Sequence, residues 1–466
     1  MKRLAPLVLL ALFAGGCYPE VRTISWTPDG SKGLMVSQDK LYSLDADGKL
    51  THLGDGVDRA AWVGDGKQVV VARVSEVKTW KDLAKELDEP TTLTVTILAK
   101  AIRMEILERK GKTDLPFTVV SEPNQKLLLP VLLYLRDNLQ EGLPQIIGEE
   151  KWEKFAEVKL PLWKVLLCDA SPGLKVRATL ATMFDCTSIL PSPDGKFVAL
   201  VGSPVNDAGP GSGPGLFIAQ DGRDGLDKLA DDVNDWPAWT PDGSRIVYAK
   251  ASGQYAEGVA GDIHSTRMSG PQDSRTGTLG SLWFMPQVRV FPAGKDAALF
   301  SSMKVTLPRG SDDSAAVLSK VTTKDGKNVV EVLDKVKLPE DIVQLELSPD
   351  GRHVAVVTIE AAVALTRISD GKVLWAQKGT GGAARFVTMP SWRTNDQLLV
   401  ICPPKTEWNS SAHNEAVLLE VKGDEVKTIK VLSKDWPAKV KAGLLLVEPP
   451  KTQPRSPGPT TTTTAP

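Results

Sequence analysis

Apolar and polar residues alternate along most of this chain in short runs, and tight turns separate the runs. In the first module, residues 23–26 form an extended run, residues 27–30 (Thr-Pro-Asp-Gly) turn, and residues 34–36 return. Two further runs follow at 40–44 and 50–53. In such a turn Pro presets φ, Asp hydrogen-bonds nearby backbone, and Gly supplies a positive φ. Alternation with a period of two predicts strands, and four short antiparallel strands are the unit of a propeller blade.

The turn recurs seven times, each copy followed by a run rich in β-branched residues. Self-similarity with a period of roughly 40–50 residues indicates a propeller or a solenoid. We predict an all-β propeller of four-stranded antiparallel sheets, with seven blades favoured and six as the alternative. Weaker copies of the turn lie at 291–294 and 392–396. We expect the following residues to build the other turns: Trp26, Asp29 and Gly30; Asp65 and Gly66; Asp194 and Gly195; Trp239, Asp242 and Gly243; Asp350 and Gly351.

The order strand, Ser/Thr-Pro-Asp-Gly, β-branched strand resembles the TolB-type propeller repeat, also called PD40, a WD40-like repeat that lacks the Trp-Asp dipeptide. The resemblance covers residues 21–75 and 160–447, and the copies at 26–30, 239–243 and 347–351 match it closely. It implies the propeller of the periplasmic protein TolB and of the non-catalytic domains of prolyl oligopeptidases, in which rings often have six blades. The motif is specific for the fold and implies almost nothing about chemistry.

Residues 76–160 interrupt this pattern. Apolar residues recur there at helical spacing, which predicts three or four amphipathic helices. An extended conformation is the alternative for the β-branched stretch 91–97. Because strand pattern resumes at 163–170, the helices would interrupt the second blade between its second and third strands. Two interpretations of this insertion are open: it marks a binding face of the repeat scaffold, or it is an inert helical cap. The apolar run 127–133 is expected to form the core of this insertion.

The two ends of the chain are not expected to belong to the fold. Residues 1–16 have a basic start, an apolar run and small residues, the order of a secretory signal peptide. With Cys17 next, the segment resembles the bacterial lipobox, which implies lipidation of Cys17; ordinary cleavage with a free thiol is the alternative. Tyr18 in place of Asp then implies the periplasmic face of the outer membrane, with the cell surface as a second location. Residues 451–466, rich in Pro and Thr, are expected to be a disordered tail.

Charge and cysteine content narrow the function classes. The chain has 56 basic and 57 acidic residues, so nothing indicates a nucleic-acid partner. After Cys17 only Cys168, Cys186 and Cys402 remain, which allows at most one disulfide, with Cys168 and Cys186 the nearest pair. We predict no metal site and no cofactor, because no Cys/His cluster is present and the four histidines are scattered: His52, His264, His353 and His413.

No catalytic motif emerges from the sequence. The glycine-rich stretch 209–215 has the wrong spacing for a nucleophile elbow, and neither a Walker loop nor a dinucleotide fingerprint is present. The domains would be propeller at 17–75 and 161–450 with the helical insertion between them. We therefore predict a lipid-anchored, exported propeller that binds proteins of the cell envelope or acts as a scaffold there without chemistry. A small ligand or glycan in the channel, or an unrecognised hydrolase or lyase site there, is the alternative.

Overall fold

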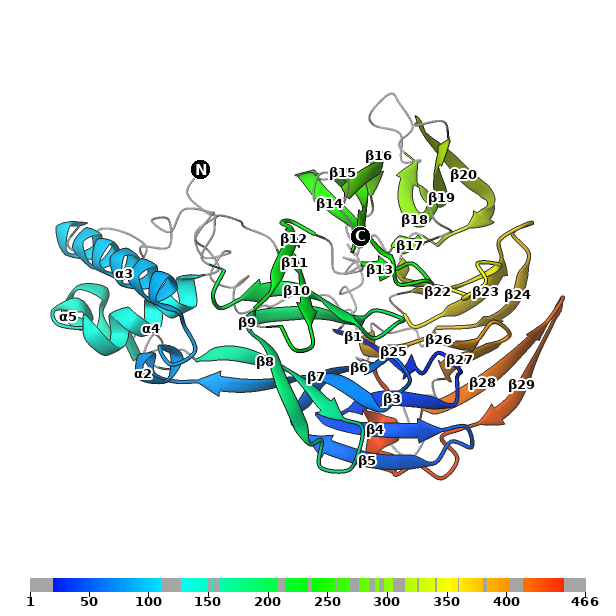
Figure 1. The fold of residues 1–466 in the computed structure, drawn as a ribbon, viewed down its shortest axis with the longest axis horizontal. Helices are drawn as coiled ribbons and strands as arrows, with labels where there is room; N and C mark the ends of the chain where they lie inside the picture. Colours follow the sequence, from blue (N-terminus) through cyan, green and yellow to red (C-terminus); the bar gives the residue numbers. More distant parts are fainter. Residues whose placement is uncertain are drawn as a thin grey trace, which may run out of the picture.

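The computed structural model has mostly antiparallel sheets that follow one another around a common centre, the arrangement of a propeller (Figure 1). Residues 1–19 and 448–466 lie outside the described residues, and so do the predicted signal peptide, Cys17 and the predicted tail. The structure describes residues 20–109, 127–149, 152–153, 157, 159–207, 214–223, 225–233, 237–255, 258–268, 276–284, 290–292, 297–304, 315–324, 327–339, 342–358, 360–379, 384–402 and 414–447.

Three sheets have four antiparallel strands in sequence order. The first contains β2 (Ser25–Trp26), β3 (Lys32–Ser37), β4 (Lys40–Asp45) and β5 (Leu50–Asp55). The second contains β21 (Ile342–Leu347), β22 (His353–Thr358), β23 (Val363–Arg367) and β24 (Val373–Gln377). The third contains β26 (Ser391–Thr394), β27 (Gln397–Cys402), β28 (Glu415–Lys422) and β29 (Glu425–Val431).

The remaining large sheets are longer. A seven-stranded sheet is built from β6 (Val57–Val63), β7 (Gln68–Val77), β8 (Leu160–Asp169), β9 (Val176–Pro191), β10 (Phe197–Pro204), β11 (Gly215–Gln220) and β12 (Asp227–Ala230). An eight-stranded sheet is built from β13 (Ala238–Trp239), β14 (Arg245–Tyr255), β15 (Gly258–Arg267), β16 (Thr276–Phe284), β17 (Val290–Pro292), β18 (Ala297–Lys304), β19 (Ala315–Lys324) and β20 (Lys327–Lys337).

The number of sheets differs from the prediction. The described residues form five sheets of four or more strands, so the expectation of seven, or six, separate four-stranded sheets is wrong. Continuity of the backbone is the reason: the 16-residue β9 pairs with β8 through residues 176–183 and with β10 through residues 183–191. In the eight-stranded sheet, β16 meets β18 through the pair Phe284 and Ser302. Each repeat turn nevertheless lies between two strands that pair with each other.

The strands that follow the turns are buried on both faces. Residues 33–37 of β3, 353–357 of β22 and 398–401 of β27 are all buried. A strand covered on both faces carries a continuous apolar run rather than alternation. The β-branched run after each turn is therefore the middle of a sheet that packs between neighbouring sheets.

The first and last sheets contact each other, although they lie at opposite ends of the chain. One hydrophobic cluster joins Met35 and Leu44 to Leu399, Leu418 and Trp436. In Figure 1 the strands β28 and β29 (orange) lie beside β3 and β5 (blue). A small sheet also joins the chain ends: β1 (Glu20–Thr23) pairs in parallel with β25 (Ala384–Met389), which pairs with β30 (Leu445–Val447). The sheets therefore form a closed ring.

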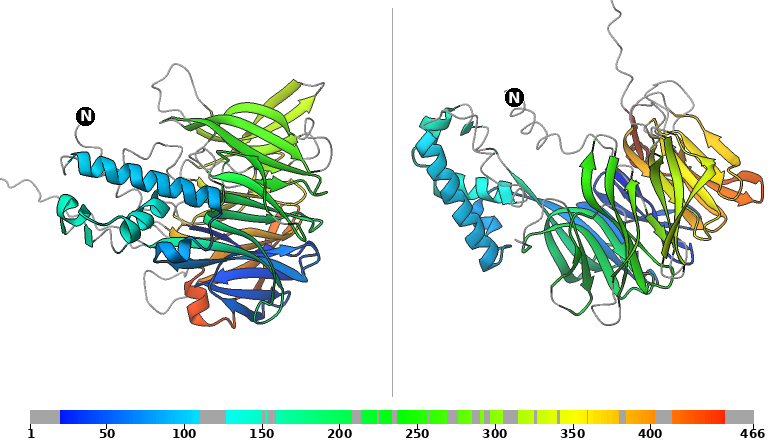
Figure 2. Two further views of the ribbon diagram at one scale, coloured as in Figure 1. Left: turned by 60° about the vertical axis from the view of Figure 1, so that its left-hand side comes forward. Right: turned by 90° about the horizontal axis from the view of Figure 1, so that it is seen from above.

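Helices lie between β7 and β8, which pair with each other from Val77 and Leu160 inward. They form a unit in whose core the run 127–133 is largely buried, as predicted, and this core also includes Leu160, Leu162 and Phe184 of the seven-stranded sheet. The extended alternative for 91–97 is not found, since these residues are helical. The unit stands to one side of the sheets (Figure 2). Its helices are α2 (Trp80–Leu83), α3 (Glu89–Arg109), α4 (Leu128–Asn138) and α5 (Leu143–Ile147).

A last short helix, α7 (Ala438–Ala442), precedes β30. Within the described part of the chain, no helix combines the length and the hydropathy that crossing a membrane requires.

Candidate functional site

The repeat turns are held by their own carboxylates. The Thr27 hydroxyl donates to Asp29 Oδ1 at 2.7 Å, and the Ser31 amide donates to the same oxygen at 3.0 Å. Hydroxyls of Ser192, Thr240 and Ser348 donate in the same way, at 2.6–2.7 Å, to Asp194, Asp242 and Asp350. In the second copy Asp65 accepts from the Lys67 amide at 3.2 Å. The turn glycines all have positive φ, between +66° and +76°: Gly30, Gly66, Gly195, Gly243 and Gly351.

These hydrogen bonds lower the pKa of the Asp29 and Asp242 carboxyls to about 2. The Thr240 hydroxyl, and then the amide and hydroxyl of Ser244, lower the pKa of Asp242 from 3.8 to about 2. A carboxyl whose pKa is lower in the folded state than in the unfolded state stabilises the fold at pH values above its ordinary pKa. This stabilisation is lost as the pH falls through the pKa of the folded state.

We expect the stability of the wild type to fall more steeply than that of Asp242→Asn as pH decreases from 3.8 to about 2. The measurement is denaturant unfolding at each pH, with carboxyl NMR titration of Asp242. Thr240→Val keeps the carboxyl but removes its main donor, so the Asp242 pKa should rise toward 3.8. An Asp242 titration unchanged by Thr240→Val would contradict this account of the turn.

The tryptophans of the repeats link neighbouring sheets. The indole N–H of Trp26 donates to Ser391 Oγ at 3.0 Å, and that of Trp239 donates to the Leu190 carbonyl at 2.8 Å. Ser391 and Leu190 each stand one residue before the turn unit of the adjoining module. Together with the turn carboxylates, these side chains therefore stabilise the ring and provide no catalytic arrangement.

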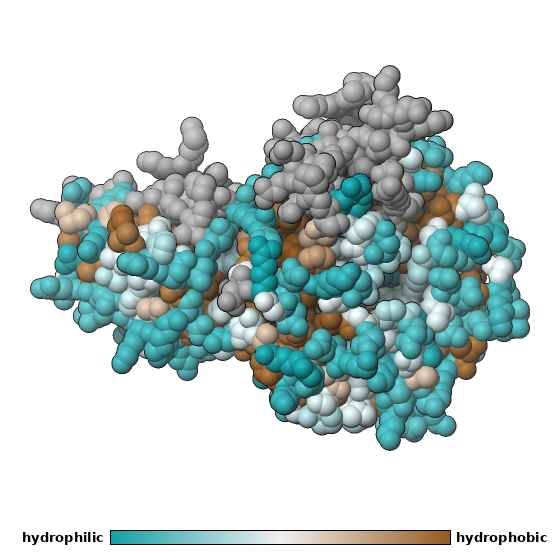
Figure 3. All heavy atoms as spheres, in the orientation of Figure 1, coloured by the Kyte–Doolittle hydropathy of each residue, from teal (hydrophilic) through white to brown (hydrophobic). Residues whose placement is uncertain are grey.

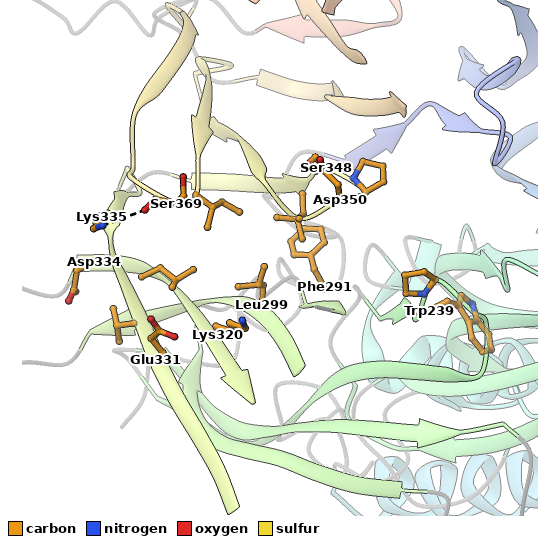
Figure 4. Close-up of a pocket in the computed structure, with 17 residues that line it drawn as sticks. Trp239, Phe291, Leu299, Lys320, Glu331, Asp334, Lys335, Ser348, Asp350 and Ser369 are labelled. Atoms are coloured by element: carbon orange, nitrogen blue, oxygen red, sulfur yellow. Dashed lines mark hydrogen bonds between the residues drawn. The ribbon is translucent and has the colours of Figure 1, made fainter. Parts of the chain in front are cut away.

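A groove of about 990 Å³ opens between the eight-stranded sheet and the sheet β21–β24. Apolar side chains of Phe291, Leu299, Leu333, Leu347 and Ile368 line it and belong to one core cluster. The turn 348–351 lies beside Phe291, and Trp239 lies at the opposite end of the lining from Asp334 and Lys335 (Figure 4). Residues from three separate repeats therefore meet here.

Charged side chains surround the apolar part of the groove. Lys320 on β19 and Glu331 on β20 are direct cross-strand partners. Asp334 and Lys335 follow on β20, and Lys335 Nζ donates to the Ser369 carbonyl at 3.4 Å (Figure 4). With Asp350, the lining holds three carboxylates and two amines, which gives it a slight negative balance. Such a groove suits an extended chain with apolar side chains better than a compact anion.

A second feature lies on the helical unit. Val95, Ala99, Ile102 and Ile106 of α3 face the core of the unit. On the other side of the same helix Leu93, Ile97 and Met104 are 59%, 57% and 53% exposed. Figure 3 shows hydrophobic side chains on the face of this lobe that is turned to the viewer. Residues four and seven apart lie on one side of a helix, so the three side chains form one apolar stripe, which we call the α3 stripe.

The cysteines and histidines do not form a site in the described residues. Cys168, Cys186 and Cys402 form no disulfide in the described part of the chain, so the disulfide that the sequence allowed is not found. Burial raises the pKa of the Cys186 thiol to about 12, which makes its thiolate scarce. His264 stacks on Tyr248 and His353 on Trp392, while His413 lies outside the described residues. Within the described ranges, no group of three or more His, Cys, Asp or Glu is placed to hold a metal ion.

The sequence-predicted turn residues contribute only partly to the groove. Trp239, Asp350 and Gly351 line it. Phe291 on β17 belongs to a weak copy of the turn, but the groove side chains on β18 to β20 carry no motif, and only the structure brings them together. The α3 stripe had a signal in the sequence, because Leu93, Ile97 and Met104 fall at helical spacing on a second side of the helix.

Comparisons with known proteins identify no family. No family model matches the chain, and no curated protein matches it. Solved structures similar to it include the β-propeller domain of Cps50 (Swd1) from Myceliophteria thermophila, at 12% identity and a TM-score of 0.33, covering 53% of this chain and 67% of that one. The dihydro-heme d1 dehydrogenase NirN in complex with DHE is 11% identical with a TM-score of 0.43.

The similarity to NirN covers 89% of this chain and 66% of NirN. An acylaminoacyl peptidase from Pyrococcus horikoshii is 12% identical with a TM-score of 0.36, covering 58% of this chain and 41% of that one. The chain thus spans about two thirds of the length of the first two and less than half of the third. Similarities at this level assign no activity or partner, and membership of the TolB-type family stays a prediction.

Proposed function

We propose that this protein is a lipid-anchored, exported propeller that binds other proteins of the cell envelope and performs no chemistry. The observation that carries the proposal is the α3 stripe. Large apolar side chains more than half exposed on one side of a helix mark an interaction surface when they are contiguous. The helical unit is then the binding arm and the ring is its support.

Burial on the opposite side of α3 argues that this helix needs a partner. Large apolar side chains on a second side of a helix are normally covered by another surface. The inward face of α3 already packs against α4 and α5. The exposed residues Lys100 and Glu108 lie on the same side of the helix, Lys100 between Ile97 and Met104 and Glu108 four residues after Met104, and they would make the polar contacts of the interface. The partner would therefore present an apolar surface of helix length.

The binding arm is tested by photo-crosslinking in the native cell. A photoreactive amino acid at position 97 should give a discrete crosslinked partner, and one at the exposed position 428 on β29 should not. The double variant Leu93→Glu/Met104→Glu should abolish that crosslink. Val373→Glu/Ile429→Glu changes two similarly exposed apolar residues of outer strands and should leave the crosslink intact. Equal loss of the crosslink in both double variants would overturn the assignment of the binding surface.

The anchor is a separate part of the proposal. Cys17 stands three residues before β1, so a lipid there would hold the ring within about 10 Å of the membrane surface at about 3.4 Å per residue. Multiple acyl chains anchor a protein stably where one does not. Growth with labelled palmitate should label the wild type and not Cys17→Ala. An unlabelled wild type ends the anchor proposal and leaves the binding arm to be judged by its crosslinks.

A further inference from the structure

The outermost strand of the eight-stranded sheet is unusually long. β20 has 11 residues and pairs with β19 along one edge. The last strands of the other large sheets, β5, β12, β24 and β29, have only four to seven residues. Across the described residues, no strand pairs with the second edge of β20. Native proteins usually keep such edges short or charged, because unpaired N–H and C=O groups recruit another strand.

Apolar side chains follow this free edge. Val329, Val330 and Val332 are 54%, 39% and 36% exposed. Side chains alternate along a strand, so Val329, Glu331 and Leu333 point to one face. Glu331 and Leu333 line the groove, and so does Val332 between them. An added strand would place alternate side chains on that same face. The edge and the groove are therefore one continuous surface.

A bulge shapes the end of this surface. The pairing moves from Ser319 with Val332 to Val317 with Lys337, so residues 333–336 of β20 face a single residue of β19. A bulge of this kind bends its strand away from its partner. Here it carries Lys335 to the β23–β24 turn, where Lys335 Nζ donates to the Ser369 carbonyl at 3.4 Å (Figure 4). The bulge ends the regular edge and forms one wall of the groove.

We propose that the free edge of β20 binds an extended peptide segment of a partner protein as an added strand, and that the peptide's apolar side chains enter the adjoining groove. The unpaired backbone groups specify an extended chain, and the lining of Phe291, Leu299 and Leu333 specifies apolar side chains. Glu331, which is exposed and lies on β20, favours a basic residue in the peptide, whereas Asp350 already lies 3.4 Å from Arg352 and Lys335 already donates to Ser369. This site is independent of the α3 stripe.

The test uses the full chain and a fluorescein-labelled decapeptide that alternates Val with Thr and carries one central Lys. Fluorescence anisotropy should show saturable binding. N-methylation of alternate residues removes backbone donors without changing side chains. One of the two N-methylated registers should bind at least tenfold more weakly, and the other should bind like the parent. Equal binding of the parent and of both N-methylated peptides would overturn the proposal. A groove that contacts only the side chains of the peptide would bind all three peptides equally.

Protein variants locate the site. Val332→Lys should weaken binding of the decapeptide at least tenfold, and the matched change Ile429→Lys on the outer strand β29 should not. Glu331→Gln should weaken the Lys-bearing decapeptide more than one with central Gln. If Val332→Lys and Ile429→Lys bind the decapeptide equally, the site is not at β20. If sedimentation of the protein alone shows a dimer that Val332→Lys dissociates, the edge belongs to a second copy of the chain, and the proposal is wrong.

Discussion

Replacing Trp436 with alanine is expected to lower the free energy of unfolding by about 3–5 kcal/mol, as is usual when a buried tryptophan is truncated. Trp436 is 5% exposed and packs in the cluster that joins the first and last sheets. Its indole N–H donates to the Gly48 carbonyl at 2.6 Å, across 388 positions of sequence. Its loss would remove both apolar contacts and a hydrogen bond from the place where the ring closes.

Denaturant unfolding followed by circular dichroism measures this effect. Trp436→Phe is the matched control, because it keeps most of the ring contacts and loses the N–H. It should cost about 1–3 kcal/mol, the penalty for leaving the buried Gly48 carbonyl without its donor. If Trp436→Ala is as stable as the wild type, the last segment does not hold the ends of the ring together.

Replacing Leu133 with alanine is expected to destabilise the helical unit by about 2–5 kcal/mol, the usual range for a buried leucine. Leu133 on α4 is fully buried in the core that α2 to α5 form. Because this core includes Leu160, Leu162 and Phe184 of the seven-stranded sheet but no residue of β26–β29, the loss should be confined to the helices and the strands next to them. Native-state hydrogen exchange should show faster exchange in α3 and α4, with β26–β29 unchanged.

The matched control for the helical unit is Leu93→Ala. The residue type and the substitution are the same, but Leu93 is 59% exposed. Surface substitutions usually change stability by less than about 0.5 kcal/mol. Uniform loss of protection across the ring in Leu133→Ala would show that the helical unit and the sheets unfold as one.

The sequence predicts the local elements well because each has a local cause. The Thr-Pro-Asp-Gly turns around Asp29 and Asp242 are stabilised by contacts within five residues. The helical periodicity of 80–147 also depends on near neighbours. The way in which neighbouring sheets join cannot be predicted from such local contacts. Nothing in residues 176–191 indicates that one strand passes from the edge of β8 to the edge of β10, because only tertiary packing decides between a bend and a break.

The candidate sites divide in the same way. The α3 stripe could be derived from the spacing of Leu93, Ile97 and Met104 once the inward face of the helix is known. The groove could not be predicted, because its lining combines Trp239, Phe291, Glu331 and Asp350 from three repeats. The turn motif of Asp350 gives this residue a structural role, and its place beside a cavity follows only from the closure of the ring.

Zero-length crosslinking tests the closed ring most directly. Lys430 Nζ lies 2.8 Å from Asp47 Oδ1, 383 positions away in sequence, on the first and last sheets. Carbodiimide treatment of the monomer, followed by mass spectrometry, should join these two side chains, and Asp47→Asn should abolish the product. The pairs Lys372–Asp424 at 2.6 Å and Lys164–Glu86 at 2.7 Å serve as internal controls. Recovery of both control products without the Asp47–Lys430 product would contradict a closed ring.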